Sequence, residues 1–137
     1  MEEYNFGLTN NAAAIEPLQK ELQTTLQAGG LRLHFISALN VALGEWLENI
    51  IQYAYPDGGT HRIEVQCRVS ELDLIVRVTD GGREFDPSHF PDTSARASDE
   101  NVLAARGLHL IRNLMDHVSH ERVNGHNVLV LTKHLSR

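Results

Sequence analysis

The sequence is poor in cysteine, in positive charge and in long apolar runs, and each shortage excludes a class of protein. The single cysteine, Cys67, cannot form a disulfide within the chain and is typical of a reducing compartment. The longest apolar stretches have the length of strands, well short of a membrane span. The acidic N-terminus MEEYNFGLTN lacks the apolar centre of a signal peptide. We therefore predict a cytoplasmic protein that does not enter a membrane.

Basic residues are outnumbered by acidic ones. The chain has 12 Lys and Arg residues against 18 Asp and Glu residues, a formal net charge of −6. Because the basic residues are scattered, no positive stripe is available for a nucleic-acid backbone, and direct nucleic-acid binding is not expected. Hydrophobic residues make up 42% of the 137 residues, enough for one modest core. We predict a single domain over residues 1–137.

Several common catalytic signatures are missing from the sequence. It contains no Walker-type phosphate loop, no Gly-x-Ser-x-Gly elbow and no Cys-x-x-Cys pair. Of its eight histidines, only His117 and His120 lie close together, and no second cluster pairs with them. A histidine metal centre is therefore not expected. If the chain binds a nucleotide, it must use another scheme.

The spacing of apolar residues predicts the order of the elements. Helical spacing indicates helices at about 15–28, 33–54 and 108–115, with Asn10 and Asn11 as caps for the first of them. Alternation indicates strands at 4–8, 63–69, 72–78, 118–123 and 128–133, the last two joined by Asn124-Gly125. No period holds from 80 to about 105, which suggests either function or disorder. This order predicts a two-layer α/β sandwich, with three helices on one face of a mostly antiparallel, mixed sheet.

Glu45 and Asn49 form the first candidate constellation. They lie four residues apart and share one face of the second expected helix. A carboxylate can accept a proton from a hydroxyl or orient it, and an amide oxygen can coordinate a hard cation such as Mg²⁺. Taken alone, the pair is more typical of a solvated helix face.

Two further constellations follow along the chain. Asp80 ends a strand and precedes two glycines, where an aspartate can accept a hydrogen bond from an exocyclic amine such as that of adenine. An ordinary strand-ending turn is the alternative. The segment Arg106-Gly107-Leu108 is expected to open the third helix, where backbone N–H groups can bind phosphate. Taken alone, the segment is more typical of a plain helix start.

The three constellations together resemble the GHKL superfamily, which has the Bergerat ATP-binding fold and includes histidine kinases and gyrase. The resemblance covers about residues 5–135 and rests on the order and spacing of three boxes. These boxes are Glu45-x-x-x-Asn49 followed by Ala54-Tyr55-Pro56, then Asp80-x-Gly82-x-x-Phe85-Asp86-Pro87, and last Arg106-Gly107-Leu108. Within the superfamily, the chain is similar to the anti-sigma-factor serine/threonine kinases.

The resemblance implies ATP and Mg²⁺ as ligands. Asn49 would hold Mg²⁺, and Glu45 would act as the catalytic base or would orient the acceptor hydroxyl. Asp80 would recognise the adenine amine, Gly82 would give the base room, and residues 88–105 would form a lid. The residues assigned to the nucleotide by resemblance are Asn49, Asp80, Gly82, Phe85, Arg106, Gly107 and Leu108.

The resemblance also implies partners. In this family the acceptor is a serine or threonine of a small anti-anti-sigma (STAS-type) protein, and the kinase sequesters a sigma factor. A homodimer through the edge of the N-terminal strand is suggested by family analogy. A catalytic piece of a histidine kinase is disfavoured, because no helical dimerisation segment with a phosphoacceptor histidine precedes Glu45.

Four residues depart from the family's usual pattern. Glu84 and Ala105 stand where glycine is frequent, Tyr53 where histidine is common, and Asn127 near a threonine that helps to bind adenine. These departures leave a second function open. The chain would then be a non-catalytic regulatory module that binds a regulator, with nucleotide as a switching ligand or lost.

Overall fold

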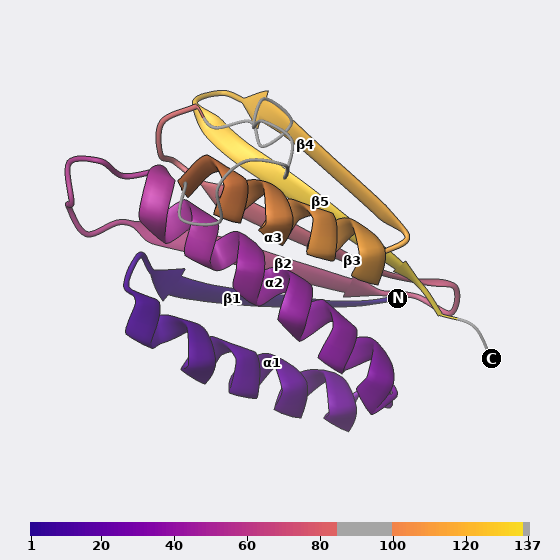
Figure 1. Cartoon of the computed structure of the whole chain (residues 1–137). Coiled ribbons are helices and arrows are strands. Elements are labelled where there is room, and N and C mark those ends of the chain that lie inside the picture. Colours follow the sequence, from indigo (N-terminus) through magenta and orange to yellow (C-terminus); the bar gives the residue numbers. More distant parts are fainter. Residues whose placement is uncertain (85–99, 136–137) are drawn as a thin grey trace.

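The computed structural model describes residues 1–84 and 100–135, without the side chains of residues 100–106. Three α-helices and a five-stranded sheet form two layers, with the helices on one face of the sheet (Figure 1). Along the chain the elements are β1 (Glu2–Thr9), a 3₁₀ turn η1 (Ala12–Ala14), α1 (Ile15–Ala28), α2 (Leu33–Tyr53), β2 (Arg62–Val69), β3 (Asp73–Asp80), α3 (Glu100–Leu114), β4 (His117–Val123) and β5 (His126–His134). The two-layer α/β architecture predicted from the sequence is confirmed.

The strand order across the sheet is β1-β2-β3-β5-β4, with β3 at the centre. Every neighbouring pair of the described strands is antiparallel, so the sheet is not mixed. The turn between β4 and β5 carries positive φ angles at Asn124 (49°) and Gly125 (80°). Positive φ at both central residues is the type I′ geometry that matches the twist of a hairpin, as the Asn-Gly pair predicted.

Helix α1 begins after a short 3₁₀ turn, whose first N–H groups are capped by Asn11 through a 3.0 Å bond from Ala13 N. Pro17 therefore lies in the first turn of α1, where its missing N–H needs no partner. Helix α2 lies between α1 and α3 (Figure 1). Because it is covered on several sides, α2 buries residues around most of its circumference, including Ile36, Leu43 and Trp46.

Helix α3 begins at Glu100 and not near Arg106, so the predicted helix start at Arg106-Gly107-Leu108 is wrong. The sequence ENVLAAR contains no Gly or Pro and is rich in strong helix formers, which allows a helix without clear apolar periodicity. Residues 100–105 of the predicted lid are thus helical. The rest of that lid, and Phe85, lie outside the described residues.

Candidate functional site

The contact between α2 and α3 brings two of the predicted boxes together. Glu45 and Asn49 point from α2 toward Gly107 of α3. A Cβ placed on Gly107 would lie 3.0 Å from Glu45 Oε2 and 3.8 Å from Asn49 Nδ2. Residues more than fifty positions apart in the sequence therefore share one site. Glycine at 107 therefore lets α3 approach the Glu45 and Asn49 side chains closely.

Asn49 is a buried polar side chain, with 6% of its surface exposed, and its Nδ2 has no hydrogen-bond partner. Leaving such a group unpaired costs roughly 1–3 kcal/mol, so it is a natural contact for a ligand. Rotation of the terminal amide exchanges its oxygen and nitrogen, which lets the side chain present an oxygen to a cation. The residue thus fits the Mg²⁺ implied by the family.

The described residues contain no group of three or more His, Cys, Asp or Glu side chains able to hold a metal ion. A Mg²⁺ ion at Asn49 would therefore take most of its ligands from phosphate oxygens and water, as this ion commonly does. Glu45 differs from Asn49 because it is only partly buried.

Asp80 ends β3 and is almost fully buried, at 1% exposure. Its Oδ1 accepts two hydrogen bonds of 3.0 Å, from Gly82 N and from Asn127 Nδ2. Its Oδ2 is buried without a partner. Burial raises the pKa of Asp80, and the two hydrogen bonds and the nearby positive charges oppose that shift only in part. An unpartnered acceptor in this position suits an amine donor such as that of adenine.

Gly82 packs against the end of α2. A Cβ at this position would lie 2.5 Å from Ala54 O and 2.6 Å from Ala54 Cβ, so a side chain is excluded. The neighbouring Arg83 stabilises this contact between the turn and α2. It donates from its backbone N to Ala54 O (2.9 Å) and from Nε to Tyr53 O (2.6 Å). The sequence predicted that Gly82 gives a base room. The structure shows a packing reason for glycine, because the turn approaches the helix backbone directly.

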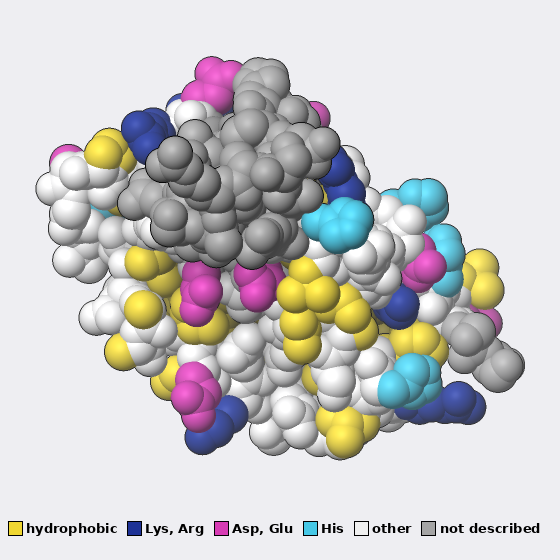
Figure 2. Space-filling view, viewed as in Figure 1, with side chains coloured by type: hydrophobic (Ala, Val, Ile, Leu, Met, Phe, Trp, Pro, Cys, Tyr) yellow, Lys and Arg dark blue, Asp and Glu magenta, His cyan; other side chains and the backbone are white. Residues whose placement is uncertain are grey.

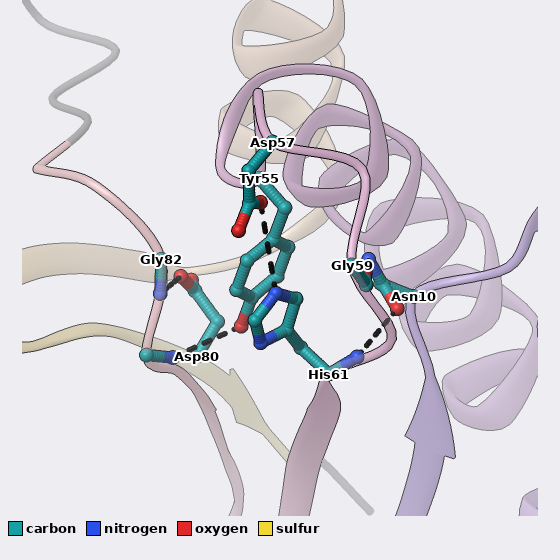
Figure 3. A network of polar contacts seen from close by, with 8 residues as sticks. Asn10, Tyr55, Asp57, Gly59, His61, Asp80 and Gly82 are labelled. Carbon is teal, nitrogen blue, oxygen red and sulfur yellow. Dashed lines mark hydrogen bonds and ion pairs between the residues drawn. The ribbon is translucent and has the colours of Figure 1, made fainter.

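Tyr55 is a site residue that sequence reasoning treated only as part of a turn. Its hydroxyl accepts a 3.1 Å hydrogen bond from Gly81 N, next to Asp80. Its ring stacks on His61 with centroids 4.1 Å apart and planes 8° apart. His61 N in turn donates to Asn10 Oδ1 at 2.8 Å, and Figure 3 shows how this network links the end of β1 to the Asp80 turn.

Asn127 and Arg122 complete the surroundings of Asp80. Asn127 is 1% exposed and donates to Asp80, while Arg122 donates from Nη1 to Gly82 O at 2.8 Å. No motif marked Arg122, but its place opposite Asn127 in the β4–β5 hairpin follows from the register about the Asn124-Gly125 turn. That register is the signal that would have found it.

The remaining predicted residues are placed as follows. Leu108 is buried at 5% exposure, and Arg106 belongs to α3, in the segment whose side chains lie outside the described part of the structure. On the face seen in Figure 2, Lys and Arg side chains are scattered and form no stripe. Within the described ranges, no helix has the length and apolar character needed to cross a membrane.

The fold and the site define a class of protein, and comparison with known families names it. The model of the histidine kinase-like ATPase domain matches residues 8–133. The chain therefore belongs to the histidine kinase-like ATPase family. The resemblance drawn from the three boxes is confirmed, although one box lies inside a helix and not at its start.

Comparison with individual proteins shows which members of the family the chain is similar to. Over 104 residues the chain is 31% identical to the serine/threonine-protein kinase BtrW of Bordetella bronchiseptica, covering 75% of this chain and 72% of the relative. It is 30% identical over 147 residues to the serine-protein kinase RsbW of Bacillus subtilis, covering 94% and 90%. A second RsbW, from Halalkalibacterium halodurans, is 31% identical, and the match spans 64% of it.

Among solved structures, the RsbU and RsbW domains of a Mycobacterium tuberculosis protein align with a TM-score of 0.72. The alignment covers 100% of this chain and 33% of that one, at 19% identity. At this level of identity the likeness shows the fold alone. It agrees with the antiparallel sheet and the three covering helices described above.

Proposed function

We propose that the protein is an ATP-dependent serine/threonine kinase that phosphorylates a small anti-anti-sigma (STAS-type) protein and sequesters a sigma factor or a similar regulator. The observation that carries the ATP site is the buried, unpartnered Oδ2 of Asp80. The names of the relatives support the kinase activity.

In this proposal each side chain has one task. Asp80 accepts a hydrogen bond from the adenine amine through Oδ2, while its Oδ1 is held by the protein. Asn49 contributes an oxygen to Mg²⁺, and a bound Mg²⁺ would neutralise charge on the phosphates. The resemblance assigns Arg106, Gly107 and Leu108 to the phosphates, and it assigns Phe85 to the same box as Asp80.

Glu45 is the proposed catalytic carboxylate. Its Oε2 lies beside the Cβ position of Gly107, and the side chain is only partly buried, so an incoming hydroxyl can reach it. The carboxylate accepts the proton of a serine or threonine hydroxyl as that oxygen attacks the terminal phosphorus, and ADP leaves. Phosphoryl transfer depends mainly on positioning and charge neutralisation, so one well-placed carboxylate is sufficient.

The test is phosphate transfer from Mg-ATP to a purified STAS-type partner. Glu45→Gln is expected to slow transfer about a hundredfold or more while ATP still binds. Glu48→Gln is the matched control, because Glu48 lies on the same helix and is exposed. Wild-type protein that transfers no phosphate, or a Glu45→Gln variant as fast as wild type, would contradict the kinase assignment.

A second candidate is the regulatory module without catalysis. It is favoured by the position of Gly107 in the middle of α3, since N–H groups beyond the first turn of a helix are bonded within it and cannot hold phosphate. Thermal unfolding with millimolar Mg-ATP separates the kinase from a module that has lost nucleotide, because a ligand that binds only the folded state raises stability. No shift, together with tight partner binding, would favour the module.

Location and assembly belong to the same proposal. We place the protein in the cytoplasm, where a sigma factor acts. A homodimer would form through β1, which is an edge strand of the sheet and presents unpaired backbone groups. Sedimentation of the wild type against a variant with a proline in β1 tests this assembly.

A further inference from the structure

A row of three polar side chains crosses the sheet at the candidate adenine site. Register places Asp80 of β3 opposite Asn127 of β5, and Asn127 opposite Arg122 of β4. Directly paired residues of neighbouring strands point to the same face. The row therefore extends from the buried Asp80 at the centre of the sheet to the exposed Arg122 at its edge.

Asn127 is engaged almost entirely within the protein. Its Nδ2 donates to Asp80 Oδ1 (3.0 Å) and to Arg83 O (2.7 Å), and its Oδ1 accepts from Arg122 Nη1 (3.0 Å). An amide nitrogen has two donors, and both are used. Asn127 thus has no N–H left for a ligand, and its contact with Asp80 is the route by which we expect it to affect a nucleotide.

Arg122 joins the row to the turn that follows Asp80. A single nitrogen, Nη1, donates to Gly82 O (2.8 Å) and to Asn127 Oδ1 (3.0 Å). Gly82 N also donates to Asp80 Oδ1, so the turn is held at its N–H and at its carbonyl (the Asp80–Gly82 turn is seen in Figure 3). These contacts hold Asp80 Oδ1 in place and leave Asp80 Oδ2 as the acceptor without a partner.

We propose that Arg122 and Asn127 are positioning residues for nucleotide recognition, which hold the Asp80 carboxylate with one oxygen free for the adenine amine. This inference rests on the proposed ATP-binding function. Arg122 and Asn127 together form what we call the clamp on Asp80. Asn127 lies near the position where the resemblance to the family implied a threonine that helps to bind adenine.

Charge supports the same assignment. Burial raises the pKa of Asp80, and the Asn127 and Gly82 hydrogen bonds and the positive charges of Arg122 and His120 oppose the rise. Among the described residues, Tyr55, after α2, is a further titratable group near the carboxylate. Removing the guanidinium is therefore expected to let Asp80 take up a proton at a higher pH. A protonated Asp80 is a weaker acceptor for the base.

The experiment measures Mg-ATP affinity by calorimetry from about pH 4 to pH 8 and apo stability by thermal unfolding. Arg122→Gln is expected to weaken ATP about tenfold, the size of one charge-assisted hydrogen bond, and to lose affinity at a higher pH than wild type does. Arg122→Lys retains the positive charge but lacks the planar guanidinium, so the pH dependence of its ATP affinity should return toward that of wild type. Asn127→Ser should weaken ATP by a similar factor.

Arg77→Gln is the matched control, because Arg77 is an exposed arginine on the opposite face of β3. Equal ATP losses in Arg77→Gln and Arg122→Gln would overturn the inference, since both would then reflect overall charge. A wild type that binds ATP together with an Arg122→Gln variant of unchanged affinity and pH profile would overturn the clamp alone. A wild type that does not bind ATP would overturn the proposed function and the clamp together.

Discussion

Replacing Gly107 by alanine separates stability from function in one substitution. Gly107 lies in the interior of α3, where glycine is less favourable than alanine by about 1 kcal/mol. The added Cβ would meet Glu45 Oε2 at 3.0 Å, the flexible end of a side chain that can move by a few tenths of an ångström. The folded protein should therefore gain up to about 1 kcal/mol, or roughly 3 °C in Tm.

The same methyl group should harm the site, because it pushes the proposed catalytic carboxylate away and approaches Asn49 Nδ2 at 3.8 Å. We expect Gly107→Ala to transfer phosphate at least tenfold more slowly, since small misplacements of reacting groups are costly. Gly44→Ala is the control: Gly44 is also inside a helix, but its Cβ would meet Gln19 Nε2 at 2.8 Å, away from the site. Gly107→Ala with full activity, or with a large loss of stability, would refute this reasoning.

Three further predictions concern the Asp80 end of the site. Tyr55→Phe should lower the free energy of unfolding in urea by about 1 kcal/mol, because Gly81 N loses its acceptor, and an unchanged value would contradict this role. GTP should bind at least tenfold more weakly than ATP in calorimetry, since guanine presents an acceptor where adenine presents an amine, and equal affinities would exclude recognition by Asp80. Because the pKa of Asp80 is raised in the folded protein, its stabilising contribution is present at low pH and is lost as the pH rises from about 4 through the raised pKa. The free energy of unfolding of Asp80→Asn should therefore increase relative to that of wild type across this pH range. A difference that stays constant with pH would contradict the raised pKa.

Local patterns predicted most of the fold. Alternation marked β2 and β3, and the Asn124-Gly125 pair marked the last hairpin, because these signals depend on neighbours in the sequence. The start of α3 was missed because ENVLAAR favours a helix by composition without showing an apolar period. That error placed Gly107 at a helix terminus, whereas it lies where α3 meets α2.

The sequence singled out the main side chains of the candidate site but not the residues that hold them in place. Glu45, Asn49 and Asp80 belong to recognisable boxes, while Arg122 and Tyr55 act through contacts with backbone atoms of a distant turn. Such contacts depend on strand register and on packing, which single-residue motifs do not encode. Asn127 was noted only as a departure from the family, and the structure shows both of its N–H donors directed at the Asp80 turn.

The central claim is that the free Oδ2 of Asp80 recognises the base of ATP, and titration of Mg-ATP into wild type and Asp80→Asn tests it most directly. The substitution keeps the shape and the Oδ1 contacts but places an amide nitrogen where the acceptor was. We predict saturable binding to wild type and at least tenfold weaker binding to Asp80→Asn, with the apo Tm of the variant equal to or above that of wild type. Equal affinities, or no binding by wild type at millimolar Mg-ATP, would contradict the claim.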